Sequence, residues 1–336
     1  MDLKTLTEIN APSGHEQAIR RFLLDELKKL GFAPVLDRMG NVVVVKEGTG
    51  DAPRKRVMVS AHMDEVGLIV TSATEDGYLR IAAAGGIDPR VLVSKRVTVG
   101  VDKLPGVIGA VPIHLQSAAE RKHVLSMDEL LVDIGAKNKD EAECKAPMGT
   151  YISFDTPYVE YGDGFACGKA FDDRVGCLSL LRLLQEELPV DLVACFVSEE
   201  EVGCRGAKGA AFQQEPDIGI VLEGTTCNDL GDVPETAHVC EAGQGVAVSF
   251  MDGASIANRT LFRKALNVAK QENIPHQVKH SVSGGNDGGA IQRAREGVPV
   301  VVLSVPCRYI HSPSSVVKLS DVESQFALVK ALVKAL

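Results

Sequence analysis

Three consecutive carboxylates stand at Glu199, Glu200 and Glu201, directly after an apolar run that begins near residue 190. Like charges at such short range raise one another's pKa values unless a cation or an acid–base task uses them. A solvated loop between a strand and a helix is the alternative interpretation, although three acidic residues are more than helix capping requires. The triplet therefore predicts a site that binds a cation or transfers protons.

A second group of this kind is the His-x-Asp pattern of His62 and Asp64, which follows an apolar run over residues 57–60. Side chains two residues apart in an extended segment point to the same side, and ligands bind at the carboxyl ends of strands in open α/β sheets. A metal-bound imidazole normally donates its other N–H to an orienting acceptor. A lone histidine at a strand end is more often structural, but the carboxylate two residues later weakens that interpretation and makes His62 a candidate metal ligand.

Three further candidates stand at the ends of predicted elements: Asp172 before a helix, Glu223 after a strand, and His311 a few residues beyond another strand. Asp172 alone could equally be a helix N-cap. Taken together, however, the candidate ligands combine imidazoles and carboxylates with no thiolate. That donor set matches a pair of hydrolytic Zn²⁺, Co²⁺ or Mn²⁺ ions better than a structural zinc site.

A framework must bring these strand ends together. From about residue 162 onward, short Val-rich runs alternate with amphipathic segments, which predicts a three-layer α/β sandwich with helices on both faces of a mainly parallel mixed sheet. An N-terminal helix is expected after a capping box formed by Ser13 and Glu16, and a C-terminal helix after a cap formed by Ser320 and Glu323. The other expected helices cover 175–188, 205–214, 255–273 and 289–295, and the expected strands cover 41–45, 57–60, 190–198, 218–222, 246–250 and 298–305.

The α/β pattern is interrupted by a segment of different character. Between Gly67 and Tyr161 the chain shows short alternating runs punctuated by Gly and Pro, with little helical periodicity, which predicts a small β-rich domain. We therefore expect residues 1–66 and 162–336 to form one catalytic α/β domain and residues 67–161 to form an inserted domain. The candidate site must then be assembled from both sides of the insertion.

Composition excludes several classes of function. With 45% hydrophobic residues among 336, the chain can bury a large core and a smaller inserted one. A formal net charge of -9 gives no basic patch for nucleic acid. Only 4% of the residues are aromatic and none is Trp, which disfavours a carbohydrate-binding cleft.

The sequence contains no stretch of about 18 consecutive apolar residues and no basic region followed by an apolar run at its start, so we expect a cytoplasmic protein that does not contact membranes. Its eight cysteines lack any C-x-x-C pair or regular spacing, which predicts reduced structural thiols.

The ordered motifs His-x-Asp, Asp-Asp-Arg, Glu-Glu-Val-Gly, Glu-Gly-Thr-Thr and Ile-His-Ser-Pro resemble one family closely. This is the family of dinuclear metallo-aminopeptidases of the tetrahedral (TET) type, which includes glutamyl and deblocking aminopeptidases, FrvX-like proteins and CelM-like proteins once labelled endoglucanases. The resemblance runs from residues 11–14 to the C-terminal helix. It implies a cytosolic enzyme that removes N-terminal residues from short peptides, using a water molecule activated between two metal ions.

The resemblance also implies a role for each candidate. Two divalent ions per subunit, Zn²⁺ or Co²⁺ with Mn²⁺ as a further option, would be held by Asp172 as the bridge, by His62 and Glu223 in one site, and by Glu201 and His311 in the other. Glu200 would be the general base and Asp64 would orient His62. The sequence departs from the family pattern at two positions. Glu199 stands where most members have Gln, and Glu223 stands where some relatives have Asp.

For the fold, the resemblance implies a zinc-exopeptidase-like sandwich with a β-barrel or PDZ-like insertion, which serves in assembling dimers into a homododecamer. It also implies a cis peptide bond between Asp172 and Asp173. The segment 283–288 resembles a loop near the family's specificity pocket, with Asn286 where Thr is commoner.

The spacing of residues does not locate the pocket that sets substrate preference. We name only Asp287 and Arg308 as candidate substrate-binding residues. Arg308 could favour acidic substrates or could be a structural, salt-bridged Arg. Three alternatives to the aminopeptidase remain open at this point: a metal-dependent amide deacylase, an endoglucanase, and a catalytically inactive assembly protein.

Overall fold

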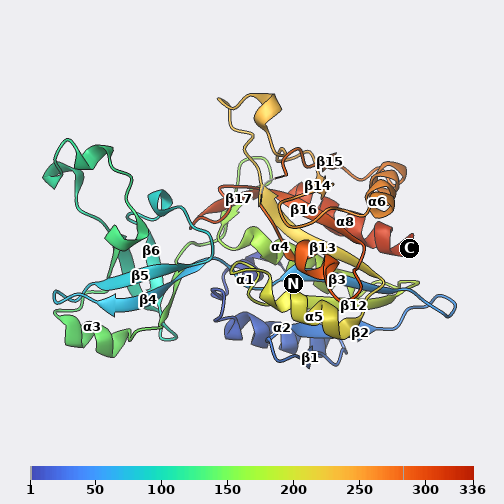
Figure 1. The fold of residues 1–336 in the computed structure, drawn as a ribbon, viewed down its shortest axis with the longest axis horizontal. Coiled ribbons are helices and arrows are strands. Elements are labelled where there is room, and N and C mark those ends of the chain that lie inside the picture. Colours follow the sequence, from blue (N-terminus) through green and yellow to red (C-terminus); the bar gives the residue numbers. More distant parts are fainter. Residues whose placement is uncertain (1, 283) are drawn as a thin grey trace.

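The computed structural model describes residues 2–282 and 284–336, so Met1 and Ser283, the first residue of the predicted pocket loop, lie outside the described residues. It contains a large helix-covered sheet and, beside it, a closed β-barrel (Figure 1). The predicted fold class, an α/β sandwich with an inserted β-barrel, is confirmed. In the described part of the chain, no helix has both the length and the apolar character needed to cross a bilayer.

The large sheet has eleven strands among the described residues, and its four central strands are mutually parallel. The flanking strands run antiparallel to their neighbours, except that the two strands over residues 246–249 and 276–278 are parallel to each other. In spatial order the strands are β1 (Val35–Leu36), β2 (Val42–Lys46), β12 (Asp191–Val197), β3 (Arg56–His62), β13 (Ile218–Thr226), β16 (Val300–Arg308), β17 (Ser315–Lys318), β11 (Phe165–Gly168) and β10 (Val159–Tyr161), with β14 (Val246–Ser249) beside β16 and β15 (His276–Val278) beside β14.

Alternation along the central strands produces the three layers. In β12, Leu192, Ala194 and Phe196 enter one hydrophobic core, while Val193 and Cys195 enter the other. This period of two is what a strand buried on both faces requires. The helices of the first core are α1 (Leu3–Thr7), α2 (Gln17–Lys29), α4 (Phe171–Leu183), α6 (Arg259–Gln271) and α8 (Leu319–Lys334), and those of the second are α5 (Arg205–Gln214) and α7 (Asp287–Gln292).

The barrel is closed by six antiparallel strands and has its own hydrophobic core. In order around the barrel, the strands are β4 (Gly67–Ala73), β5 (Leu79–Ala84), β8 (Leu131–Asp133), β7 (Leu104–Gly109), β6 (Arg96–Val99) and β9 (Tyr151–Phe154), with α3 (Lys139–Lys145) at one side. The short 3₁₀ helices are Pro89–Val91, Ile113–Leu115, Glu120–Lys122 and Met127–Glu129 here, and Glu235–Ala237 in the α/β part. Since β10 pairs with β11 of the large sheet, residues 159–161, which we assigned to the insertion, hydrogen-bond within the large sheet.

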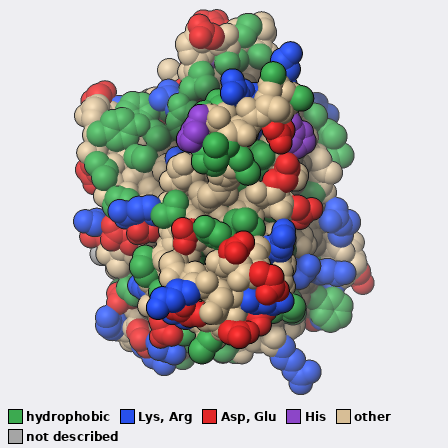
Figure 2. Space-filling model, turned by 90° about the vertical axis from the view of Figure 1, so that its left-hand side faces the viewer, with side chains coloured by type: hydrophobic (Ala, Val, Ile, Leu, Met, Phe, Trp, Pro, Cys, Tyr) green, Lys and Arg blue, Asp and Glu red, His purple; other side chains and the backbone are tan. Residues whose placement is uncertain are grey.

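The barrel carries much exposed apolar surface. Seen from the barrel side, the molecule shows hydrophobic side chains gathered on one part of this face and mixed charges on another (Figure 2). Exposed apolar side chains from the barrel segment include Val101, Val111, Ile113, Leu115 and Met148. Exposed clusters of this kind are typical of surfaces that contact another protein.

Two predicted caps are wrong. The helix α2 begins at Gln17 without a side-chain cap, because the Ser13 hydroxyl donates to Asp64 instead, at 2.6 Å. The helix α8 begins at Leu319, so Ser320 lies in its first turn rather than before it.

Candidate metal centre

The candidate ligands converge at the carboxyl ends of the four parallel strands. His62 is the last residue of β3, Glu200 and Glu201 follow β12, and Glu223 lies within β13, which continues to Thr226 rather than ending at Leu222. His311 follows β16 in a turn. Because these strands are neighbours in the sheet, residues as much as 249 positions apart in the sequence meet at one edge.

The first half of the centre surrounds His62. Its Nε2 lies 3.4 Å from Asp172 Oδ1 and 3.6 Å from Glu223 Oε2, and the His62 side chain is fully buried. Neither His62 Nε2 nor Glu223 Oε1 has a hydrogen-bond partner among the described residues. Buried polar atoms of this kind normally have a partner, so these two atoms are suited to bind a ligand.

The second half surrounds His311, whose Nε2 lies 3.4 Å from Asp172 Oδ2 and 3.3 Å from Glu201 Oε2. The His311 side chain is 40% exposed, so this half opens toward solvent. Asp172 therefore presents one carboxylate oxygen to each histidine. Such an arrangement suits a carboxylate shared between two ions.

The distances fit a metal better than direct hydrogen bonds. Two nitrogen or oxygen ligands at about 2.0–2.2 Å from a tetrahedral Zn²⁺ are separated by roughly 3.3–3.6 Å, whereas an N–H···O hydrogen bond is most often near 2.9 Å. The four separations, from 3.3 to 3.6 Å, are therefore those of atoms that could ligate common ions. The residues present fit divalent metal ions.

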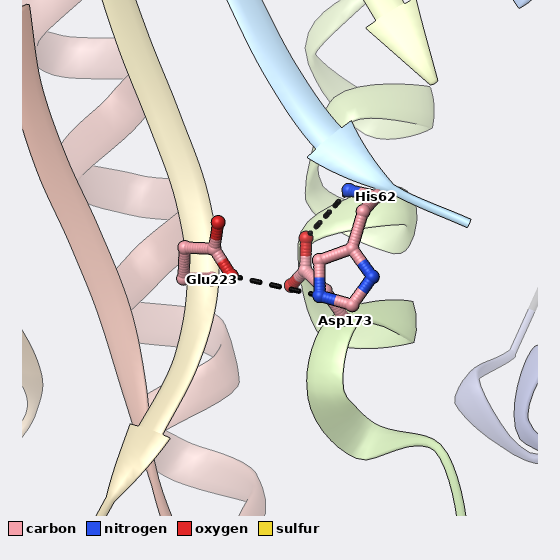
Figure 3. Close-up of side chains that lie close together, drawn as sticks. All are labelled: His62, Asp173 and Glu223. Atoms are coloured by element: carbon pink, nitrogen blue, oxygen red, sulfur yellow. Dashed lines mark hydrogen bonds and ion pairs between the residues drawn. The ribbon is translucent and has the colours of Figure 1, made fainter. Parts of the chain in front are cut away.

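Asp173 also lies beside His62 and Glu223, and its carboxylate could in principle join them around an ion (Figure 3). Its two oxygens, however, accept hydrogen bonds from backbone N–H groups, Oδ2 from His62 at 3.1 Å and Oδ1 from Gly176 at 3.0 Å. Asp173 thus ties the end of β3 to the start of α4. Its neighbour Asp172 is left to face the two histidines, and the expected cis peptide bond joins the two residues.

Asp64 connects three parts of the centre. Its Oδ1 lies 3.4 Å from His62 Nδ1 and accepts from the backbone N–H of Glu200 at 3.0 Å. Its Oδ2 accepts from the Ser13 hydroxyl at 2.6 Å and from the backbone N–H of Glu201 at 3.2 Å. Besides its expected contact with His62, Asp64 therefore holds the backbone of Glu200 and Glu201.

The electrostatics of the centre show an excess of buried negative charge. Burial, followed by repulsion from neighbouring carboxylates, raises the pKa of Glu200 and raises that of Glu223 well above its usual value. Burial also raises the pKa of Glu201 to about 8. Burial disfavours protonation of His311, but Asp172 and Glu201 outweigh it and raise the pKa to about 9. Burial thus makes these carboxyl groups costly to ionise, and a cation bound among them would offset that cost.

The raised pKa values predict how the metal-free protein responds to pH. Glu201 titrates near 8 instead of 4.5 and His311 near 9 instead of 6.5, so between about pH 5 and 9 the folded state binds more protons than the unfolded state. Their contribution to stability is present at low pH and is lost as pH rises through 8 to 9. Metal binding needs the deprotonated ligands and therefore stabilises more at high pH.

We expect the melting temperature of the metal-free protein to fall from pH 6 to pH 9, and the gain in melting temperature on adding metal to grow over the same range. Differential scanning calorimetry with and without metal measures both quantities. A metal-dependent gain that is constant or shrinks with rising pH would contradict this description of the centre.

The glutamate triplet is divided by the fold. Glu200 lies beside the centre, and its Oε1 accepts from the Cys204 thiol at 3.3 Å. Glu199 has a positive φ of 56° and its carboxylate pairs instead with Arg205 at 3.3 Å. The residue that departs from the family pattern is thus held outside the centre.

A cavity of about 130 Å³ adjoins the centre. It is lined by three of the five candidate ligands, by the candidate base, and by the predicted pocket loop through Gly284, Gly285 and Asn286. Of the two candidate substrate-binding residues, Asp287 is fully buried, and Arg308 makes two 2.7 Å contacts with Asp229. Of the two interpretations offered for Arg308, the structure therefore agrees with the structural, salt-bridged Arg.

Sequence reasoning missed several groups near the centre. Lys169 and Glu65 form a buried ion pair at 2.7 Å beside the candidate ligands, and Lys279 lines the cavity with its side chain largely buried. No local pattern marks these residues. Glu65 directly follows Asp64 and Lys169 stands three residues before Asp172, but neither motif assigns them a role.

The chain is similar to known proteins over nearly its whole length. A family model described as M42 glutamyl aminopeptidase matches residues 40–328. A putative aminopeptidase from Acetivibrio thermocellus is 35% identical over 99% of this chain and 97% of its own. A TET aminopeptidase from a marine sediment archaeon superposes with a TM-score of 0.94 at 33% identity, covering 99% and 95% of the two chains. The Pyrococcus horikoshii TET1 peptidase, which can assemble into a tetrahedron or a large octahedral shell, gives 0.87 at 33% identity, covering 99% and 98%.

Proposed function

The chain belongs to the M42 glutamyl aminopeptidase family, and from this premise we propose that it is a cytoplasmic enzyme that uses two divalent ions to remove N-terminal residues from short peptides. Peptidase activity and metal dependence follow from the family. The number of ions, their ligands, the base and the substrates are the parts we propose here. A solved structure from Thermotoga maritima that is named an endoglucanase is also 33% identical to this chain, but the imidazole and carboxylate donors favour a metal-dependent hydrolase over a glycosidase.

One observation carries the proposal. Asp172 presents Oδ1 to His62 and Oδ2 to His311, each at 3.4 Å, and each histidine has its own glutamate within 3.6 Å. We assign His62 and Glu223 to one ion, His311 and Glu201 to the other, and Asp172 to both. Zn²⁺, Co²⁺ and Mn²⁺ all accept this donor set, and we favour Zn²⁺ or Co²⁺.

When bound, the ions polarise the scissile carbonyl and make water acidic enough to be deprotonated near neutral pH. We assign to Glu200 the transfer of a proton from the attacking water to the leaving amine, and its position in the lining of the cavity with Asp172 and Glu223 supports this assignment. Burial raises the pKa of Glu200 and so makes it a stronger base. Asp64 holds Glu200 in place through its backbone N–H.

The size of the cavity supports cleavage at a chain end. At about 130 Å³ it is smaller than the roughly 300–1,000 Å³ of typical ligand pockets. Such a cavity admits one terminal residue more readily than the middle of a folded chain. The free N-terminal amine would enter a region rich in carboxylates, which favours a cation.

Aminoacyl p-nitroanilides test this function directly when compared with their N-acetylated counterparts. We expect hydrolysis of the free-amine substrates only, and loss of that activity after chelation. Preference for the N-acetylated series would indicate a deacylase, and activity on cellulose that survives chelation would support a glycosidase, which needs two carboxylates and no metal.

We also propose that the protein forms a homo-oligomer, in which the barrel takes part and for which a dodecamer is the expected size. Exposed apolar side chains of the barrel segment (Figure 2) and the assembly known for the TET1 peptidase support this. Light scattering coupled to gel filtration gives the mass in solution. A monomer at micromolar concentration would rule the assembly out.

A further inference from the structure

A separate group of potential metal ligands lies next to the proposed base. It consists of Glu200, which follows β12, Cys204, which precedes α5, and Asp287, the first residue of α7. One ligand atom from each lies within 4.8 Å of the other two. Glu200 and Asp287 are 87 positions apart in the sequence, and the packing of α7 against α5 brings the three side chains together.

Asp287 is the unusual member of this group. It is fully buried, and neither carboxylate oxygen has a hydrogen-bond partner among the described residues. An unpaired buried carboxyl is costly, and most buried polar side chains have a partner. Burial, together with repulsion from Glu200, raises the pKa of Asp287 well above its usual value. A cation placed between the three groups would compensate this carboxylate.

The donor set specifies the kind of cation. Cys204 Sγ lies 3.3 Å from Glu200 Oε1, close to the roughly 3.5 Å that separates a sulfur and an oxygen ligand of one tetrahedral Zn²⁺. A thiolate selects soft or borderline cations over Mg²⁺, Ca²⁺ and Mn²⁺. The five proposed ligands of the main centre include no sulfur, so the two sites differ in what they prefer.

We propose that Glu200, Cys204 and Asp287 form an additional site for one thiophilic divalent cation, Zn²⁺ or Cd²⁺. Binding releases the thiol proton of Cys204 to solvent as its sulfur ligates the ion. One consequence rests on the proposed function of Glu200 as the base. Because an ion bound to this carboxylate prevents it from accepting a proton, excess Zn²⁺ or Cd²⁺ inhibits turnover.

The site can be tested without measuring activity, by adding Cd²⁺ to the protein that already holds the metals of its main centre and following Cd²⁺ binding. Thiolate ligation of Cd²⁺ produces an ultraviolet charge-transfer band, which nitrogen and oxygen ligands do not. We compare the wild type with Cys204→Ser and Cys204→Ala, and use Cys144→Ser, which changes an exposed thiol of the barrel domain, as the matched control.

We expect both Cys204 variants to lose part of the band and to bind one Cd²⁺ fewer per subunit by equilibrium dialysis, with affinity for that ion reduced at least about 10–100-fold. Cys144→Ser should keep the wild-type behaviour apart from any contribution of its own thiol. Equal bands and equal stoichiometry in wild type and Cys204 variants would overturn the site. A protein that shows the band difference but cleaves no peptide would refute the proposed function and leave this site standing.

Discussion

Replacing Glu200 by Gln is expected to lower turnover of an aminoacyl p-nitroanilide by about 10²–10⁴-fold, the usual contribution of a general base. The amide has nearly the shape of the carboxylate but cannot accept the proton of the attacking water. The backbone contact between Glu200 N–H and Asp64 does not involve the side chain and should persist. Metal content, measured by elemental analysis, should therefore stay at the wild-type level.

The adjacent residue supplies the matched control. Glu199→Gln makes the same chemical change one position earlier, where the carboxylate pairs with Arg205 outside the centre. An exposed pair of this kind contributes little to stability, and we expect near-normal turnover. Full activity of Glu200→Gln, or equal losses in the two variants, would refute the assignment of Glu200 as the base.

Removing one histidine at a time should remove one ion at a time. His62→Ala leaves Asp172 and Glu223 without their imidazole, while Glu201, His311 and the other oxygen of Asp172 remain. Replacing even an outer-sphere partner costs about 10–100-fold in metal affinity or activity, and losing a direct ligand should exceed this. We expect roughly half the wild-type metal content and at least a 100-fold loss of turnover.

His311→Ala should show the same loss for the other ion. His123→Ala is a suitable control, since His123 belongs to the barrel segment, where its exposed imidazole pairs with Glu129. Elemental analysis after dialysis counts the ions in all three variants. Wild-type metal content in either His62→Ala or His311→Ala would contradict the ligand assignment for that ion.

The grouping of the candidate ligands could be predicted because all of them except Asp172, which precedes a helix, follow or end a recognisable strand. A run of Val residues before His62, and another before Glu199, places both at the same edge of a parallel sheet. The division of the glutamate triplet could not be read from residue types alone. It depends on the positive φ of Glu199, which turns that side chain away from the centre.

Other parts of the site depend on contacts with no local signature. The sequence predicts that Ser13 caps a helix, but its hydroxyl donates a hydrogen bond to Asp64 instead. This contact forms because the chain before α2 lies beside the segment that follows β3. Cys204 and Asp287 are 83 residues apart, and only the packing of α5 on α7 places them beside Glu200. Periodicity identifies each helix but not the rotation that decides which side chains meet.

The central claim is that peptide hydrolysis here depends on two ions held around Asp172. The most direct test strips the protein of metal and titrates Zn²⁺ or Co²⁺ back while following hydrolysis of an aminoacyl p-nitroanilide. The account predicts no activity without metal and a rise that is complete at two equivalents per subunit, before any inhibition at higher concentration. Activity that survives stripping, or that is complete at one equivalent, would contradict it.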